Sequence, residues 1–147
     1  KMVSTQNSYN LLQRKDEIGL TEVLEMENIG YLAYSPLAFG VLSGKYLDGK
    51  KPVGARVTEF PNYSRYNSKS SLLATKRYRD IAQKSGLSLP QMALAFVNER
   101  PFVTSNIIGA TNIEQLTENI ESIDISLSED TLRSIEKVHS EIPNPAP

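Results

Sequence analysis

The amino-acid sequence predicts an α/β fold in which short parallel strands alternate with helices. Three β-like segments, at about residues 2–5, 31–34 and 103–108, are each followed by a segment with helical periodicity. This alternation is typical of βα units rather than of all-α or all-β folds. Three such strands are too few to close a barrel, and a doubly wound sheet of three strands would leave unpaired strands at both edges. We therefore expect residues 1–147 to form a single partial domain that begins in the middle of a fold.

The first two strands are expected to flank one helix. The strand near residues 2–5 precedes a helix near 20–27, which ends before the Asn-Ile-Gly sequence at 28–30. The second strand ends at residue 35, because Pro36 cannot donate to a strand ladder and restricts the residue before it. The segment 38–69 is rich in glycine and proline, and connections of this length are usually functional or mobile.

Further helices are expected after residue 70. One covers residues 71–84, and the next follows Ser88 as N-cap, with Pro90 in its first turn. Ser128 is expected to cap the last helix. The proline-rich segment 143–147 cannot be helical and should lie extended on the surface.

The segment 109–119, which follows the third strand, has the features of a phosphate-binding turn. A glycine leads into a helix whose first turn fits a capping box formed by Thr111 and Glu114. Free backbone N–H groups and the positive end of the helix dipole at such a turn suit a phosphate. An ordinary strand-to-helix connection with solvated polar residues is the alternative. The helix also carries two side-chain sets: polar Gln115, Glu118 and Asn119, which could read a ribose or adenine, and apolar Ile113, Leu116, Ile120 and Ile123 along one face.

Composition excludes several classes of function. The formal net charge of −1 gives no electrostatic case for nucleic acid or an anionic membrane as partner. No apolar run is long enough to cross a bilayer, and the N-terminus does not resemble a signal peptide. The chain has no cysteine, so disulfides and thiolate metal sites are excluded, and a reducing cytoplasm is expected.

Four segments together resemble the aldo-keto reductase superfamily. They are QNSYN at 6–10, AYSPL at 33–37, SGKY at 43–46 and the segment 109–119, in the family's order and at suitable spacing. Members of this family reduce carbonyl compounds with a nicotinamide cofactor inside a (β/α)8 TIM barrel, and the resemblance is greatest to bacterial members related to potassium-channel β subunits. It implies that this chain is the C-terminal part of such a barrel, about strands six to eight with their helices.

The resemblance also implies roles for individual residues. Gln6 matches the glutamine that hydrogen-bonds the nicotinamide carboxamide, and Tyr34 matches the aromatic residue whose ring lies against the nicotinamide. The other cofactor-binding positions fall into three groups: Ser35, Leu37 and Gly40 in the loop around the pyrophosphate; Lys45 and Arg56 in the long cofactor and substrate loop at 38–69; and Gly109, Thr111, Gln115, Glu118 and Asn119 at the adenosine end and its 2′-phosphate. A phosphate site after strands seven and eight is also a general feature of such barrels.

The cofactor is expected to be NADPH rather than NADH. Other branches of the family place an arginine or lysine among the residues that hold the 2′-phosphate, whereas Gln115 is neutral. Arg56 or Lys45 can supply the positive charge instead. No metal site is expected.

Catalytic residues are expected to be absent from this chain. The family's proton-transfer residues are an aspartate, a tyrosine, a lysine and a histidine from the first half of the barrel, which nothing here matches. His139, the one histidine, fits no catalytic pattern. The resemblance thus implies a small carbonyl substrate for the whole protein and an inactive chain without its N-terminal half. Self-association through open strand edges is a further expectation.

Two questions stay open at the level of sequence. The segment 62–66 either lines a substrate pocket or is a part of the long loop with no role in binding. A regulatory module that binds a nicotinamide nucleotide without turnover, as in channel β subunits, is the alternative to a reductase.

Overall fold

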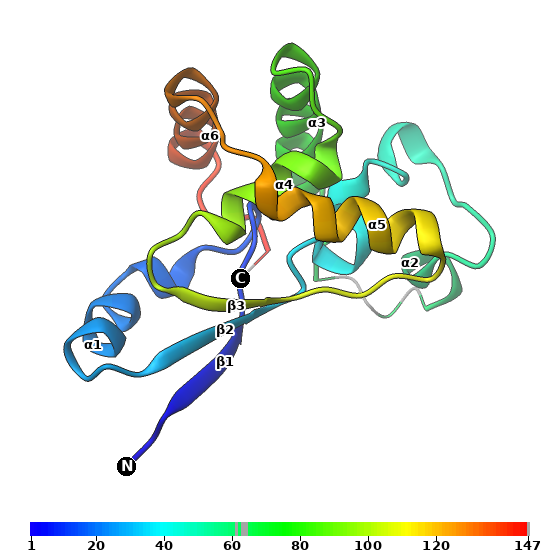
Figure 1. Ribbon diagram of the computed structural model, residues 1–147. Helices are drawn as coiled ribbons and strands as arrows, with labels where there is room; N and C mark the ends of the chain where they lie inside the picture. Colours follow the sequence, from blue (N-terminus) through cyan, green and yellow to red (C-terminus); the bar gives the residue numbers. More distant parts are fainter. Residues whose placement is uncertain (61, 63–64, 147) are drawn as a thin grey trace.

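The computed structural model, which describes residues 1–60, 62 and 65–146, contains one three-stranded parallel sheet. The strands β1 (Ser4–Ser8), β2 (Gly30–Tyr34) and β3 (Val103–Ile107) lie side by side in the order of the sequence. In Figure 1 the helices α3 to α6 gather on one side of this sheet. The predicted α/β fold with parallel strands is confirmed.

Helices occupy each connection between the strands. Between β1 and β2 lie η1 (Lys15–Glu17) and α1 (Leu20–Met26). The long connection from β2 to β3 holds η2 (Ala38–Ser43), η3 (Leu47–Gly49), α2 (Arg56–Glu59), α3 (Lys69–Lys84) and α4 (Leu89–Asn98). After β3 come α5 (Ile113–Glu121), η4 (Ser122–Asp124) and α6 (Glu129–Glu141). Among these helices none is both long enough and apolar enough to span a lipid bilayer.

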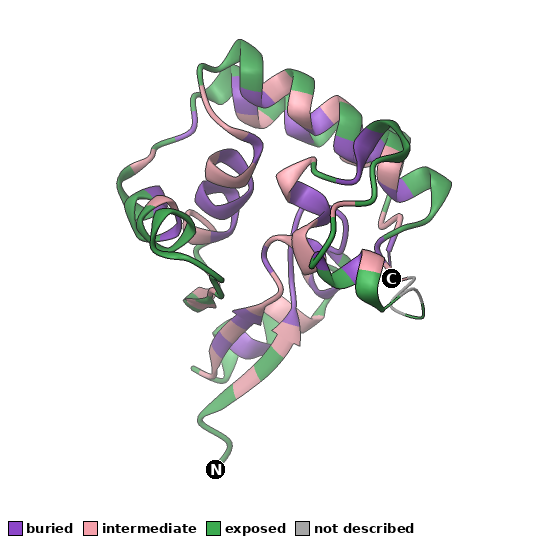
Figure 2. Cartoon of the chain, turned by 90° about the vertical axis from the view of Figure 1, so that its right-hand side faces the viewer, coloured by how far each residue is buried: buried purple, intermediate pink, exposed green. Residues whose placement is uncertain are grey.

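The hydrophobic core lies where the helices face the sheet. Helix α4 is apolar on most sides, and seven of its ten residues are buried, as expected for a helix inside a protein. The ring of Tyr9 stacks on Phe96 of α4, with ring centroids 6.1 Å apart, and meets Tyr31 and Phe102 edge-on at 6.2 and 5.2 Å. Figure 2 shows the buried residues concentrated between the elements, while the N-terminal residues run out to an exposed end.

Two sequence predictions about element boundaries were wrong. The first strand covers residues 4–8 instead of 2–5, because its pairing with β2 begins at Ser4 opposite Gly30 and leaves Met2 and Val3 exposed. Gln6 therefore lies in the middle of the strand rather than at its end. The predicted capping box of Thr111 and Glu114 is absent: Asn112 is the N-cap of α5, and its Oδ1 accepts a hydrogen bond from the Gln115 N–H at 2.9 Å.

Two further segments carry more structure than their composition predicts. The glycine-rich and proline-rich segment 38–69 contains η2, η3 and α2. The C-terminal tail is docked instead of lying free on the surface: Ala146 is buried and donates its N–H to the Leu12 carbonyl, and the Asn144 side chain accepts from the Arg14 N–H at 2.6 Å. Of the segment 62–66, residues 63 and 64 lie outside the described residues, while Tyr66 is fully buried.

Candidate functional site

The last residues of the three strands form one row across the sheet. Ser8 pairs with Tyr34, and Tyr34 pairs with Ile107. Because the strands are parallel, the turns that follow Tyr34 and Ile107 both lie at the carboxyl end of the sheet, as Figure 1 shows. The two predicted turns are thereby brought together by backbone pairing alone.

Gln6 and Tyr34 lie on the same face of the sheet. Gln6 pairs with Leu32, which lies two residues before Tyr34, and side chains two residues apart in a strand share a face. The opposite face points to the helices, since Asn7 hydrogen-bonds Asp16 of η1 at 2.9 Å. The Gln6 side chain is exposed, so this shared face is open in the described chain.

The turn after β2 has an unusual backbone. Ser35, Ala38 and Phe39 all have positive φ, at 55°, 50° and 56°. Such conformations cost non-glycine residues about 1–3 kcal/mol each and concentrate at functional sites. Asn10 holds the turn in place, because its Nδ2 donates to the Ser35 carbonyl at 2.9 Å; the Leu37 carbonyl accepts from the Gly40 N–H at 2.8 Å.

The two predicted basic residues flank this turn. A Cβ at Gly40, whose φ is +86°, would lie 2.9 Å from Cε and 3.0 Å from Nζ of Lys45, so only glycine lets the lysine fold over the turn. The Arg56 guanidinium lies 5.4 Å from the centre of the Phe39 ring, within range of a cation–π contact. Both cations therefore lie beside the segment predicted to hold a pyrophosphate.

The turn after β3 is shaped by its own side chains. Gln115 Oε1 accepts from both the N–H and the hydroxyl of Thr111, at 3.1 and 3.0 Å. Asn119 is buried, and its Nδ2 donates to the Gly109 carbonyl at 3.2 Å. Among the described residues, no atom outside its chain neighbours lies within 4 Å of a Cβ built on Gly109, so the backbone is open to close approach there.

Glu118 departs from the rest of the predicted set. Its Oε1 accepts a hydrogen bond from the Ser88 hydroxyl at 2.5 Å, which ties α5 to the N-cap of α4. The carboxylate thus points to α4 rather than to the Gly109 turn. The structure groups Ser35, Leu37, Gly40, Lys45 and Arg56 at one turn, and Gly109, Thr111, Gln115 and Asn119 at the other.

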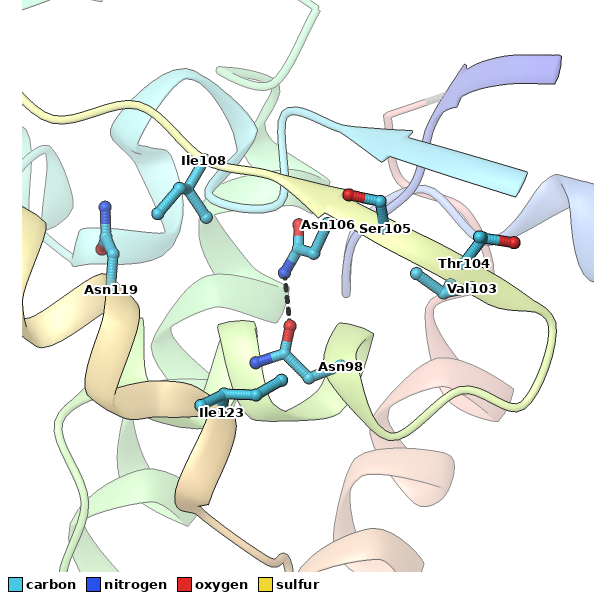
Figure 3. A pocket seen from close by; sticks show the side chains of 8 residues that line it. All are labelled: Asn98, Val103, Thr104, Ser105, Asn106, Ile108, Asn119 and Ile123. Carbon is cyan, nitrogen blue, oxygen red and sulfur yellow. Dashed lines mark hydrogen bonds between the residues drawn. The ribbon is translucent and has the colours of Figure 1, made fainter. Parts of the chain in front are cut away.

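One hollow lies beside the Gly109 turn, and another lies away from both turns. The first, of about 320 Å³, is bounded by β3, the end of α4 and α5; Figure 3 shows Asn98, Asn106 and Asn119 on its wall. The second, of about 500 Å³, lies between α3 and the start of α6. Within the described residues, no group of three His, Asp or Glu side chains could hold a metal ion.

Sequence reasoning missed a buried ionic cluster under the sheet. Arg14 donates to Glu17 at 2.7 Å and to Glu136 of α6 at 3.2 Å, and the Tyr9 hydroxyl donates to Glu17 at 2.5 Å. Burial alone would raise the pKa of Glu17, but hydrogen bonds from Arg14 and Tyr9 outweigh burial and lower it. Burial, together with Glu17, raises the pKa of Tyr9. The cluster lies on the helix side of the sheet, and no local motif reveals its link to α6, because Glu136 is 122 positions from Arg14.

Asn10 is a second residue that sequence reasoning left without a role. It is fully buried, and its Oδ1 accepts from the Leu12 N–H at 2.9 Å while its Nδ2 holds Ser35. The available signal was its place as the last residue of the QNSYN segment.

Comparisons with known proteins identify relatives over the whole chain. A model of the aldo/keto reductase family matches residues 1–140. Protein tas of Escherichia coli (strain K12) is 50% identical over 147 residues, which are 100% of this chain and 42% of that protein. L-glyceraldehyde 3-phosphate reductase of the same strain is 38% identical over 124 residues, 80% of this chain and 36% of that protein. A probable voltage-gated potassium channel subunit beta of Oryza sativa subsp. japonica is 36% identical over 125 residues, 82% of this chain and 38% of that protein. The chain thus spans about two fifths of the length of these relatives.

Proposed function

Because the chain belongs to the aldo/keto reductase family, we propose that it forms strands six to eight of a (β/α)8 barrel that reduces aldehydes or ketones with NADPH. Residues 1–147 then act as one partial domain, and the segment 38–69 is the loop that covers cofactor and substrate. The remaining strands come from the part of the relatives' length that this chain does not span. We place the activity in the cytoplasm, a proposal supported by the absence of cysteine.

The observation that carries this proposal is the pairing of Tyr34 with Ile107. It brings the ring proposed to lie against the nicotinamide to the same sheet edge as the Gly109 turn. Gln6 shares the face of Tyr34, where its side chain can reach the carboxamide of the nicotinamide. One end of the cofactor is thus assigned to β1 and β2, and the other to the start of α5.

The residues at the two turns fit a dinucleotide. Gly109 leaves room for a phosphate at the backbone, and α5 supplies the positive end of its dipole there. At the other turn, Ser35, Leu37 and Gly40 form a compact, strained loop beside Lys45. Arg56 and Lys45 are the cations that favour a 2′-phosphate, and therefore NADPH over NADH.

The reaction divides between this chain and the rest of the barrel. When bound, the reduced nicotinamide supplies a hydride to the carbonyl carbon. Tyr34 fixes which face of the nicotinamide ring points to the substrate, and Gln6 fixes the rotation of that ring. The inner face of the sheet excludes water once the barrel is closed. The family's proton donor, a tyrosine, matches no position here, so we expect the 147-residue chain alone to be inactive.

Carbonyl-dependent oxidation of NADPH tests the proposal. The complete gene product that carries these residues should oxidise NADPH with a set of aldehydes and ketones, and NADH more slowly. The 147-residue chain should show no turnover under the same conditions. Turnover by the short chain would overturn the proposed division of labour, and no NADPH turnover by the complete protein would contradict the reductase itself.

A regulatory nucleotide-binding module is the second candidate function. The observation that favours it is the similarity to the potassium channel subunit beta of rice. Tight NADPH binding without turnover by the complete protein, together with the absence of the family's tyrosine from its remaining sequence, would support this function over catalysis.

A further inference from the structure

We propose that Asn98 and Ser122 are positioning residues for the Gly109 turn, which they hold in place through Asn119. This inference rests on the proposed function, because the turn is the one assigned to the adenosine end of the cofactor. Neither residue belongs to the segments whose pattern indicated a cofactor site.

A continuous chain of hydrogen bonds links the end of α4 to the turn. Asn98 Nδ2 donates to Ser122 Oγ at 3.2 Å, and the Ser122 hydroxyl donates to the Asn119 carbonyl at 2.6 Å. The Asn119 side chain then donates to the Gly109 carbonyl at 3.2 Å. On its other side Asn98 Oδ1 accepts from Asn106 of β3 at 2.9 Å, the bond drawn in Figure 3. We call the bonds from Asn98 to Gly109 the amide relay.

The amide relay sets the direction of α5 because apolar packing does not. Hydrogen bonds between polar side chains join α5 and η4 to α4 and its N-cap, from Ser88 to Glu118 and from Asn98 to Ser122. The apolar side chains Ile120 and Ile123 are more than half exposed, and Ile123 borders the open hollow beside Asn98. Hydrogen bonds are directional, whereas hydrophobic contact is not, so the position of the turn relative to β3 depends on these bonds.

The turn itself has few other anchors. Gly109, Ala110 and Thr111 are exposed, and among the described residues the bond from Asn119 is the one hydrogen bond that reaches Gly109 or Ala110. Ser122, by contrast, is 1% exposed, so its hydroxyl does not contact a ligand directly. A change at Ser122 therefore reaches the site only through Asn119.

Two substitutions cut the amide relay, and a third is their matched control. Ser122→Ala removes the hydroxyl; Asn98→Asp keeps an acceptor for Asn106 but removes the donor to Ser122. Ser71→Ala is the control. Ser71 lies on α3, outside the amide relay, and is also a fully buried serine whose hydroxyl donates to a backbone carbonyl, that of Pro145.

The experiment uses the complete gene product and measures NADPH affinity, kcat and amide hydrogen exchange. Loss of one neutral hydrogen bond should raise the Kd and KM for NADPH about three- to tenfold in S122A and N98D, with kcat changed less than about twofold. Exchange of the peptide that contains residues 109–115 should accelerate without cofactor. In S71A the NADPH affinity and this exchange should stay at wild-type values.

Hydrogen exchange keeps the inference separate from the proposed function. If the wild-type protein does not bind NADPH, the proposed function fails, yet faster exchange of residues 109–115 in both relay variants would still support the positioning role. If S122A fails to fold, N98D decides. Unchanged exchange in the relay variants, or equal effects on affinity in S122A and S71A, would overturn it.

Discussion

Tyr34 lies directly opposite Ile107 on the neighbouring parallel strand, so the aromatic residue at the end of β2 is two residues away, in register, from the Gly109 turn. Ile107 is 39% exposed. This pairing places the motif at Tyr34 and the motif at Gly109 at the same end of the sheet, and the first two predictions depend on it.

The ring of Tyr34 should matter for its face and not for its hydroxyl. In the complete protein, Tyr34→Ala should weaken NADPH binding about five- to hundredfold, because stacking of an aromatic side chain on a flat ring is worth about 1–3 kcal/mol. Tyr34→Phe keeps the ring and should stay within about twofold of wild type. Fluorescence titration measures both. Equal losses in the two variants would show that the hydroxyl, and not stacking, carries the interaction.

Two glycines should respond in opposite ways to a side chain. Gly109 has open space around its Cβ position, so Gly109→Val should leave thermal unfolding almost unchanged while weakening NADPH binding by at least about tenfold, or 1.4 kcal/mol. Gly40→Ala should lower the melting temperature, because its φ is +86° and the new Cβ would meet Lys45. Unaltered NADPH affinity in Gly109→Val would remove the phosphate from this turn.

The sequence predicted the parallel α/β fold because each element carries its own local signal. The Ser88 N-cap and the Pro90 in the first turn of α4 are both signals from residues close together in sequence. The limits of β1 could not be predicted in this way, because its residues are mostly polar and pairing with Gly30 defines its start. The prediction of Thr111 as N-cap in place of Asn112 was wrong for a related reason, since both residue types cap helices well and the path of the chain decides.

The candidate site was predictable where it depends on motifs and unpredictable where it depends on packing. The turns at Ser35 and Gly109 follow from segments read along the chain. The contact of Glu118 with Ser88 joins residues 30 positions apart, and that of Arg14 with Glu136 joins residues 122 positions apart. Such contacts form only after the helices have packed, so no local sequence pattern predicts them.

The buried Arg14 should be one of the most sensitive positions for stability. Its side chain is 4% exposed, and its removal leaves the Glu17 carboxylate, 26% exposed, without a cationic partner. We expect Arg14→Met to lower the free energy of unfolding by about 2–3 kcal/mol, below the value for a fully buried pair because Glu17 keeps some solvent. Urea unfolding of the complete protein measures the loss.

Arg133 on α6 provides the matched control for Arg14. It also pairs with two carboxylates, Glu129 and Asp130, but it is 67% exposed. Arg133→Met should therefore leave the urea midpoint unchanged. If both arginine variants unfolded at the same urea concentration, burial of the Arg14 cluster would not be the source of its contribution.

His139 should make the protein less stable in mild acid. Burial, and then the charge of Arg14, lower its pKa, although Glu17 and Glu136 act in the opposite direction. The folded state thus binds the proton more weakly than the unfolded chain, whose histidine titrates near about 6.5. The contribution is complete above that pH and is lost as the pH falls. Urea midpoints should drop less from about pH 7.5 to about pH 5.5 in His139→Gln than in wild type; parallel slopes would contradict this.

The 147-residue chain on its own should self-associate through α5. Leu116, Ile120 and Ile123 are 39%, 57% and 65% exposed, next to the open edge of β3. Because apolar surface and an unpaired strand edge both favour association, we expect sedimentation to show oligomers at micromolar concentration. The double substitution Ile120→Lys with Ile123→Lys should shift the chain toward monomer.

Val53 separates this effect from a general gain in charge. It is 96% exposed in the connection between η3 and α2, so Val53→Lys adds a charge far from α5 and should leave the oligomers intact. In the complete protein the same α5 substitutions should instead lower the melting temperature, because the remaining strands and helices of the barrel would cover that face. A wild-type 147-residue chain that sediments as a folded monomer would show that the α5 face needs no partner, and the argument for self-association would end there.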